Sequence, residues 1–468
     1  MALQSIQHRG QDAAGVGTMH EGRIRVVKAM GLISQALPAE KINSLPGRTG
    51  IAHVRYPTAG TQAAQEDAQP FQTRRPGILL AHNGNITNVN ELDLHLQNHG
   101  LHMMSQCDAE PILLVLAHEL TNIRPAHHTV DDVVQAVGAV IQRLRGGYSV
   151  VATLQVENQE TLIAFRDPQG IRPGVYGQRA DGSWMVASES VALDVLGFKK
   201  IGDLPCDSLV LMRANEPAKI LPIPNNDTSN DAGTKQPRHC IFERIYFARP
   251  DSTMEDGRVN RTRWRMGRQL AQEWAQKGHS ADVVVAVPDT SRPAAMAMAD
   301  ELGIANREGF IKNRYSGRTF IMPDPATRDT ALRLKLNPIR EIFEGKRVLL
   351  VDDSIVRGST MKRIVEMLRS LSPQEVHVAI FSPPVRYPCF FGIDMPSRSE
   401  LVAGNLEPHT IESELCRMVG ADSLTFLSLE GLSKVNGPHI CSACFDGDYP
   451  VHVSAEERAQ ITRQRRPT

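Results

Sequence analysis

The sequence predicts an α+β domain followed by an α/β domain that is built on a parallel sheet. In the first half of the chain, short apolar or alternating segments are separated by Gly, Pro and Asn, a pattern typical of strands in sheets. In the second half, apolar segments at 281–289, 346–354 and 376–382 alternate with helical patterns. Strands that alternate with helices indicate a parallel sheet covered on both faces. A length of 468 residues accommodates two such domains, since a single core rarely grows beyond about 250–300 residues.

The elements of the first half follow from the periodicity of its apolar residues. Residues 108–120 and 131–144 have the spacing of amphipathic helices, which would pack on the sheets. A polar segment at 222–239, rich in Asn, Asp, Pro, Ser and Gly, indicates a linker. We therefore expect domains at 1–225 and 240–468. The strands of the first half are expected at TGIAHVRY, GILLAHNG, YSVVATL, TLIAFRD, WMVASES and SLVLM.

In the second half each of the first two predicted strands leads into a helix. An Ala- and Met-rich helix is expected near 292–301, after the first apolar segment. After the second segment we expect a helix whose apolar residues share one face, because residues three and four apart lie on the same side. These residues are Met361, Ile364, Val365 and Leu368. This face should pack on the sheet.

The charge balance limits the possible partners. The chain has 52 Lys and Arg residues and 52 Asp and Glu residues, so its formal net charge is zero. This balance argues against a broad electrostatic contact with nucleic acid or with an anionic membrane. The sequence has no apolar run of the ~18–20 residues that a membrane-spanning helix needs. We therefore expect a cytoplasmic protein with neither nucleic acid nor membrane as a partner.

The string VLLVDDSIVRGST at 348–360 carries the strongest chemical signal. An apolar strand ends in Asp352 and Asp353, and a short loop through Gly358 then opens a helix. The backbone N–H groups of such a loop and the helix N-terminus bind phosphate, at the sheet edge where α/β proteins bind ligands. Adjacent carboxylates beside a phosphate suit ribose hydroxyls and hydrated Mg²⁺. The alternative is a plain turn in which both Asp residues act as caps.

This string resembles the phosphoribosyl diphosphate (PRPP) motif of type I phosphoribosyltransferases. VPDTSRPAA at 287–295 looks like their pyrophosphate loop, and KNRYSGRTFIMP at 312–323 looks like the flexible catalytic loop of the amidophosphoribosyltransferase family. Closure of that loop would exclude water from PRPP. The resemblance implies a Mg²⁺ site at Thr290, Asp352 and Asp353. The PRPP-binding residues that it implies are Asp352, Asp353, Ser354, Val356, Arg357, Gly358, Ser359 and Thr360, together with Lys312, Arg314 and Arg318.

The first half resembles the N-terminal-nucleophile glutaminase domain of the same family, which implies a sandwich fold. The matching segments are HVRYPTAG at 53–60, AHNGNITN at 81–88, SQCDAE at 105–110, FRDPQGIRP at 165–173 and VASESVALDVLG at 186–197, so the resemblance covers nearly the whole chain. It implies that Arg55 binds the α-carboxylate of glutamine and that Asp108 binds its ammonium group. Asn83 and the backbone of Gly84 would stabilise the oxyanion.

The nucleophile of this glutaminase is a cysteine at the first residue of the mature protein, upstream of HRGQDAAG. Here residue 1 is Met, and the first cysteine is Cys107, at a position where the family tolerates other small residues. We therefore expect the chain as written to bind PRPP without hydrolysing glutamine. Either the protein starts upstream of this sequence or it is a variant that uses free ammonia. We favour an upstream start, because an intact glutamine pocket would otherwise serve no purpose.

The chain contains seven cysteines, and four of them form a candidate metal site. Cys441 and Cys444 belong to a C-x-x-C motif. With Cys240 and Cys389 they match the positions that ligate a [4Fe–4S] cluster in one branch of the family, since such a cluster requires four thiolates. A Cys₄ zinc site is the chemical alternative, and unconnected buried cysteines are the other. Cys206 and Cys416 are expected to be small core residues.

The resemblance implies that the enzyme transfers ammonia, taken from glutamine in the family, to PRPP in the first step of purine synthesis. It also implies Mg²⁺, a homo-oligomer (commonly a tetramer) and feedback inhibition by purine nucleotides. One alternative is a non-catalytic regulator that senses PRPP, but it would need neither the catalytic loop nor a glutamine pocket. Another is an amidotransferase that acts on a sugar phosphate, but that class lacks the string VLLVDDSIVRGST.

Overall fold

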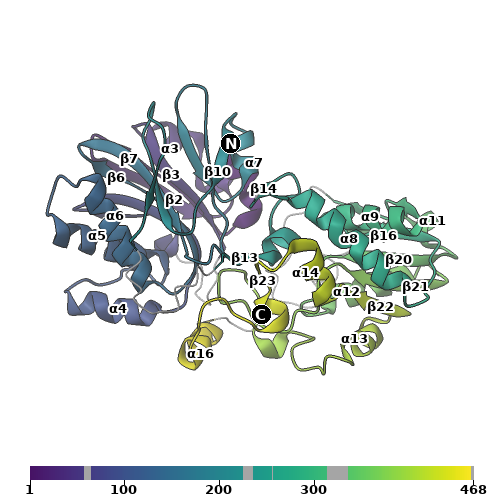
Figure 1. Cartoon of the computed structure of the whole chain (residues 1–468). Coiled ribbons are helices and arrows are strands. Elements are labelled where there is room, and N and C mark those ends of the chain that lie inside the picture. Colours follow the sequence, from purple (N-terminus) through teal and green to yellow (C-terminus); the bar gives the residue numbers. More distant parts are fainter. Residues whose placement is uncertain (57–64, 225–235, 256, 314–335, 465–468) are drawn as a thin grey trace.

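The computed structural model describes residues 1–56, 65–224, 236–255, 257–313 and 336–464. In Figure 1 the first half of the chain lies on the left in purple and blue, and the parallel sheet of the second half lies on the right in green. The C-terminal segment, in yellow, lies beneath the junction of the two halves. None of the helices in the described part of the chain is long and apolar enough to cross a membrane.

The described residues of the first half form three antiparallel sheets. The largest has the strand order β12 (Lys219–Pro222), β11 (Ser208–Met212), β7 (Gln159–Arg166), β6 (Gly146–Val156), β5 (Gly77–Ile86) and β4 (Phe71–Arg74). A second sheet has the order β2 (Arg23–Met30), β1 (Ala13–His20) and β3 (Thr49–Arg55), and the third has the order β10 (Lys199–Asp203), β8 (Val175–Gln178) and β9 (Trp184–Ala187). Each of the six predicted segments contains a strand, namely β3, β5, β6, β7, β9 and β11, and the prediction missed β1, β2, β4, β8, β10 and β12.

Helices cover one face of the six-stranded sheet, and the two smaller sheets cover the other. The helices are α4 (Val89–Asn98), α5 (Ala109–Ile123) and α6 (Val130–Arg143); α5 and α6 confirm the two predicted helices. Leu116 and Val137 from these helices pack on Val150 and Phe165 of the sheet. On the opposite face Leu79 packs against Ile51 of β3. The domain is therefore a layered sandwich, as predicted. Its short helical segments are α1 (Ala2–Ser5), η1 (Gln7–Arg9), α2 (Ile33–Ala36), α3 (Ala39–Asn43), η2 (Gln65–Asp67) and α7 (Ser190–Asp194).

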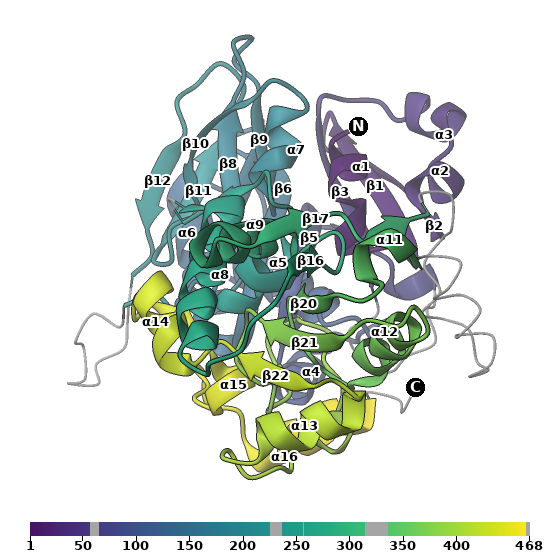
Figure 2. The same ribbon diagram turned by 90° about the vertical axis from the view of Figure 1, so that its right-hand side faces the viewer.

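The second half is built on a five-stranded parallel sheet (Figure 2). Its strand order is β17 (Ala305–Arg307), β16 (Val283–Ala286), β20 (Arg347–Asp352), β21 (Glu375–Ile380) and β22 (Ser423–Phe426). Its principal helices are α8 (Val259–Ala275), α9 (Arg292–Leu302), α12 (Ser359–Arg369), α13 (Ile411–Val419) and α14 (Leu429–Asn436). Shorter elements are η3 (Glu243–Phe247), β14 (Thr253–Met254), β15 (Gly257–Arg258), β18 (Phe310–Lys312), β19 (Leu336–Pro338), α11 (Arg340–Phe343) and η4 (Arg398–Glu400).

Alternate residues of β20 enter different cores, because successive side chains of a strand point to opposite faces. Leu349 packs with the residues of α8 and α9, whereas Leu350 packs with those of α12 and α13. The predicted apolar face of α12 is confirmed: Met361, Ile364, Val365 and Leu368 are all buried in the second of these cores. A continuous apolar strand is thus explained by helices on both faces of the sheet.

The C-terminal segment returns to the first half of the chain. β23 (Ile440–Cys441) pairs in parallel with β13 (His239–Cys240), next to the end of the linker, and α15 (Ala443–Asp446) follows it directly. On α16 (Ala455–Gln464), Glu457 forms an ion pair of 3.0 Å with Arg145 of the first half. Residues far apart in the sequence are therefore held together around the junction.

Candidate functional site

A cavity of about 320 Å³ opens on the sheets of the first half, a volume typical of small-molecule sites. Residues of both halves line it, so the second half closes one of its walls. Among the lining residues are Arg55, His82, Asn83, Gly84, Cys107, Asp108 and Arg172 from the first half, with Phe247, Gly392 and Asp394 from the second. All four residues that the sequence predicts for a glutamine pocket therefore lie in one cavity.

Gly84, on β5, adopts a backbone conformation that only glycine tolerates there. Its φ is +152°, and a Cβ atom at this position would lie 2.0 Å from the carbonyl oxygen of Gly147 on the neighbouring strand. A Cβ atom on Gly392 of the second half would in turn lie 2.7 Å from the backbone of Gly84. The close approach of three backbones thus fixes the wall of the cavity.

Asn83, the neighbour of Gly84, has one satisfied and one unsatisfied polar atom. Its Oδ1 accepts a hydrogen bond of 2.9 Å from Arg172. Its Nδ2 is buried and has no hydrogen-bond partner among the described residues. An unsatisfied buried donor is costly and rare in folded proteins, so it marks a site for an acceptor from a ligand. An oxyanion is such an acceptor.

Asp108 and Arg55 carry opposite charges in the same cavity. Asp108 accepts hydrogen bonds from His82 Nε2 (3.1 Å) and from the backbone N–H of Ile86 (2.9 Å). Burial alone would raise its pKa, but these contacts hold the pKa of Asp108 below its ordinary value, so the group is a carboxylate. Arg55 lies 3.6 Å from Asp67, and its Nη1 is buried without a hydrogen-bond partner in the part of the chain that the structure describes. This pair of charges is complementary to an α-amino acid.

Cys107 lines the cavity but is not activated. Burial, and then the neighbouring carboxylate of Asp108, raise the pKa of the Cys107 thiol to about 12. Since the thiolate is the nucleophilic form, this thiol is inert at neutral pH.

A buried network of four charged side chains adjoins the cavity, and two of its members, Arg9 and Arg172, line it. Arg9 pairs with Glu189 and with Glu243 (2.6 Å each), and Arg172 pairs with Glu243 at 2.8 Å. All four side chains are at most 5% exposed. Burial alone would raise the pKa of Glu189, but Arg9 and His8 hold it well below its ordinary range.

The sequence analysis missed this network. Arg172 and Glu189 lie inside segments that match the family, yet the pairing joins residues far apart in the sequence, and Arg9 and Glu243 are 234 positions apart. The available signal was a charged residue within an otherwise apolar segment, such as Glu243 in HCIFERIYF.

The second candidate site lies at the carboxyl end of β20. Asp352 ends the strand and accepts a hydrogen bond of 3.0 Å from Ser291, which immediately precedes α9. Gly358, with φ of +76°, turns the chain into α12, whose first residues are Ser359 and Thr360. Two loops that are distant in the sequence, one before α9 and one before α12, therefore meet at one edge of the sheet.

The two adjacent carboxylates at this edge have no ion-pair partner among the described residues. Burial and the neighbouring Asp353 raise the pKa of Asp352 well above its ordinary value, and burial raises the pKa of Asp353 to about 6. The guanidinium of Arg263 acts on Asp353 from a distance, but it donates its hydrogen bonds to three backbone carbonyls. An uncompensated pair of acids is a fitting environment for a divalent cation.

Several of the other residues predicted to bind PRPP lie in the described part of the chain, in the turn before α9, in β18 and in the loop between β20 and α12. Thr290 lies in the turn before α9, and Lys312 of β18 pairs with Asp289 of the same turn at 2.6 Å. Arg357 pairs with Glu400 at 3.0 Å, and Val356 packs on a core of the second half. Ser354 donates a hydrogen bond of 2.6 Å to Asp353. Arg314 and Arg318 lie outside the described residues.

The four cysteines of the candidate metal site lie together near the junction. Cys240 is directly opposite Cys441 in the pairing of β13 and β23. Burial raises the pKa of Cys444 well above its ordinary value, and the nearby thiols of Cys240, Cys441 and Cys389 raise it further. Cys240, Cys441 and Cys444 are buried and Cys389 is partly buried, and four such thiols are a donor set that fits a positively charged metal group.

Two family models match the chain: a glutamine amidotransferase domain over residues 55–195 and a phosphoribosyl transferase domain over residues 262–383. An amidophosphoribosyltransferase of Pseudomonas aeruginosa is 44% identical over 461 residues, which cover 96% of this chain and 89% of the relative. An amidophosphoribosyltransferase of Methanothermobacter thermautotrophicus is 38% identical over 460 residues, with 97% and 91% covered.

Solved structures agree with the predicted fold. Glutamine PRPP amidotransferase from B. subtilis, complexed with ADP and GMP, is 36% identical with a TM-score of 0.83, covering 97% of this chain and 94% of its own. A structure described as the allosteric regulatory enzyme of purine biosynthesis is also 36% identical, with a TM-score of 0.85 and coverage of 100% and 96%. The predicted fold class, a glutaminase-like domain followed by a phosphoribosyltransferase domain with a parallel sheet, is confirmed.

We predict that Glu243→Gln lowers the free energy of unfolding by about 3–5 kcal/mol, because it leaves Arg9 and Arg172 buried beside a neutral group. The measurement is the free energy of unfolding in urea of wild type, of Glu243→Gln and of the control variant Glu91→Gln. Glu91 pairs with Arg145 at an exposed site, where loss of the pair should cost about 0–1 kcal/mol. Equal effects of the two substitutions would contradict the assignment of the network as a structural support.

Proposed function

The chain belongs to the amidophosphoribosyltransferase family, which is a family of glycosyltransferases, and we propose that it transfers ammonia to PRPP to give 5-phosphoribosylamine. This reaction is the first step of purine biosynthesis. The single observation that carries the proposal is the edge of the parallel sheet where Asp352 and Asp353 lie beside the N-terminus of α12. The buried acidic pair suits the ribose hydroxyls of PRPP and a bound Mg²⁺. The adjacent helix N-terminus suits its 5-phosphate.

In the proposed reaction, the C1–O bond to pyrophosphate breaks, a C1–N bond to ammonia forms, and the new amine loses one proton. Ser359 and Thr360 with the N–H groups of α12 would hold the 5-phosphate. Asp352 and Asp353 with Thr290 would hold Mg²⁺, which neutralises charge on the departing pyrophosphate. Lys312, with Arg314 and Arg318 of the same segment, would stabilise that charge from the other side. Ammonia then needs only correct placement near C1.

The cavity of the first half would bind glutamine. Arg55 matches the substrate's α-carboxylate, Asp108 matches its ammonium group, and the free Nδ2 of Asn83 with the Gly84 backbone matches a tetrahedral oxyanion. The raised pKa keeps the Cys107 thiol protonated at neutral pH, so it is a poor nucleophile for the amide. We propose that residues 1–468 alone use ammonia, and that glutamine hydrolysis needs a cysteine ahead of HRGQDAAG.

Cys240, Cys389, Cys441 and Cys444 would hold a [4Fe–4S] cluster, with zinc as the alternative metal. The cluster would tie the region after the linker to the C-terminal segment and takes no part in the transfer, because these residues lie outside both proposed substrate sites. Since the B. subtilis relative is complexed with ADP and GMP, we also propose feedback inhibition by purine nucleotides. A homotetramer in the cytoplasm completes the proposal.

We predict that Asp352→Asn and Asp353→Asn each abolish ammonia-dependent pyrophosphate release from PRPP, because each removes a charge that Mg²⁺ requires. Asp181→Asn, at an exposed ion pair of the first half, serves as the control and should retain wild-type turnover. Normal turnover in both site variants would refute the assignment. Binding of PRPP without any turnover by the wild-type chain would instead favour the non-catalytic regulator.

The nitrogen donor is tested by steady-state assays of residues 1–468 with either ammonium or glutamine. We expect turnover with ammonium and none above background with glutamine. A longer chain that carries a cysteine immediately before the strand leading into HRGQDAAG should gain glutamine-dependent turnover. Glutamine-dependent turnover by residues 1–468 that persists in Cys107→Ala would contradict the proposal.

We predict that Cys240→Ser loses the metal group and increases hydrogen exchange of residues 437–464, which the group would otherwise hold at the junction. Iron, sulfide and zinc analysis of the purified protein identifies the metal. Cys416→Ser, at a partly buried cysteine of α13, is the matched control and should keep the full metal content. Equal metal content in the two variants would exclude a site at Cys240.

A further inference from the structure

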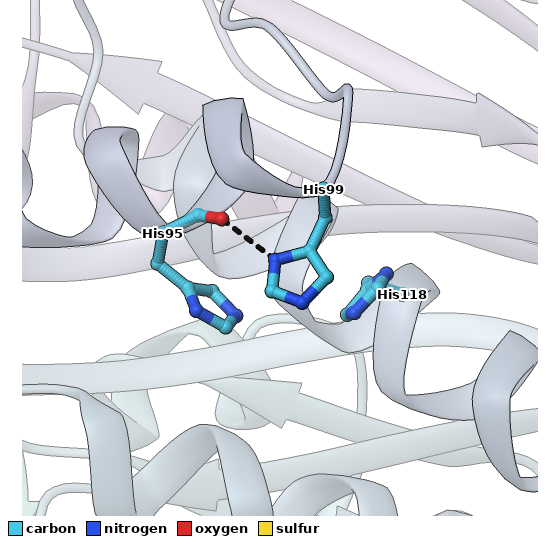
Figure 3. A group of neighbouring side chains, drawn as sticks. All are labelled: His95, His99 and His118. Carbon is cyan, nitrogen blue, oxygen red and sulfur yellow. Dashed lines mark hydrogen bonds between the residues drawn. The ribbon is translucent and has the colours of Figure 1, made fainter.

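Three histidines of the first half form a cluster that lies outside the cavity (Figure 3). His95 lies on α4, His99 immediately follows the end of this helix, and His118 lies on α5, which packs beside it. The ring of His99 lies between those of His95 and His118 (Figure 3), with ring centroids 4.6 Å and 4.4 Å from its own. One nitrogen of each ring lies within 4.8 Å of the corresponding nitrogens of the other two.

The hydrogen bond of His99 fixes which of its nitrogens can bind a metal. Nδ1 of His99 lies 2.8 Å from the backbone carbonyl oxygen of His95, as the dashed line in Figure 3 shows. Because a carbonyl only accepts, Nδ1 carries the proton, and Nε2 keeps its lone pair. Histidines that ligate metals commonly donate the opposite N–H to such a carbonyl, which holds the ring in place.

The other two rings also offer lone pairs. His95 Nε2 is shielded from solvent and has no hydrogen-bond partner among the residues described. A buried ring nitrogen without a partner is unfavourable and is explained if a ligand occupies the site. His118 Nε2 lies 2.8 Å from the Nδ2 amide of Asn122, an exposed side chain that can move away when a metal binds.

The electrostatic surroundings favour neutral rings. Burial, and then Arg143 and His99, lower the pKa of His95, while burial and His99 lower that of His118. Arg143 forms a 3.2 Å ion pair with Glu119, which offsets its charge near the cluster. Neutral imidazoles are the form that binds metal ions.

We propose that His95, His99 and His118 bind one divalent transition-metal ion of the Zn²⁺ class, with water as the remaining ligand. Three imidazoles select Zn²⁺, Ni²⁺ or Cu²⁺ over Mg²⁺ and Ca²⁺, which require oxygen ligands. Tetrahedral Zn²⁺ with Zn–N distances of about 2.0–2.1 Å needs its nitrogens about 3.4 Å apart, so the rings would close in from the 4.8 Å within which their nitrogens lie.

The proposed ion would join the end of α4 to the middle of α5. The chain between His99 and His118 includes Asp108, which lines the cavity immediately before α5. The ion would therefore hold both ends of the segment that carries this carboxylate. None of the three histidines lines the cavity, so the ion would stabilise structure rather than take part in transfer.

The test is titration of the full chain with Zn²⁺ by calorimetry, and with Co²⁺ by absorption spectroscopy. Because the four cysteines are proposed to hold a metal group as well, the quantity compared is the difference between wild type and the variants His99→Gln and His118→Gln. We expect each variant to bind one equivalent of Zn²⁺ fewer than wild type, or to bind that equivalent at least about 100-fold more weakly. Loss of an outer-shell partner alone weakens metal binding by about 10–100-fold, and these variants lose a ligand. His20→Gln, at an exposed histidine on β1, is the matched control and should bind as wild type does.

The Co²⁺ spectrum identifies the ligands. The equivalent lost in His99→Gln should lack a thiolate charge-transfer band, because its ligands are imidazoles. Zn²⁺ should also raise the unfolding temperature of wild type and His20→Gln more than that of His99→Gln. Equal stoichiometry and affinity in wild type and both cluster variants would overturn the proposal, as would a thiolate band for the equivalent that the variants lose.

Discussion

The buried ion pairs among Arg9, Glu189, Arg172 and Glu243 are the constraint on which the rest of the structure depends. Two positive and two negative side chains leave water together, so that each charge depends on its oppositely charged neighbours, and Glu189 also accepts hydrogen bonds from Ser252 and from the backbone of Arg249. Glu243 belongs to the second half of the chain, whereas both arginines belong to the first. The network therefore fixes how the two halves meet. Through its hydrogen bond to Asn83, Arg172 also orients the side chain proposed to face the oxyanion.

A second set of contacts joins the same cavity to the second half. Asn85 donates a hydrogen bond of 2.9 Å to the carbonyl of Phe390, and the backbones of Gly84 and Gly392 approach each other closely. These residues of the second half directly follow Cys389. A metal group at Cys389 would hold this segment against the strand that carries Asn83 and Gly84. The proposed cluster can thus support the glutamine pocket without contacting a substrate.

The sequence predicted what depends on local pattern. Strand β20 and the apolar face of α12 follow from the spacing of a few side chains, and the acids that end β20 follow from their place beside a phosphate-binding turn. The ion-pair network could not be predicted in this way, because Arg9 and Glu243 come together only when two domains fold and dock. His95 and His99 show a helical spacing, but their third partner is supplied by the packing of another helix. The proposed roles of Arg314 and Arg318 still rest on resemblance, since these residues lie outside the described part of the chain.

The buried ion-pair network and the acidic pair at the end of β20 differ in whether the folded chain supplies a partner for each carboxylate. This difference distinguishes a structural role from a ligand-binding role. In the network each carboxylate has an arginine partner, and the pKa of Glu189 is held low, so the folded chain itself satisfies the ionised form. At the end of β20 neither Asp352 nor Asp353 has such a partner among the described residues, and burial raises the pKa of both. Folding alone would not favour two unpaired acids at adjacent positions, since the carboxylates destabilise each other. The proposed cation would be the missing partner, and its binding together with the proposed substrate would stabilise the ionised pair that folding alone leaves unfavourable.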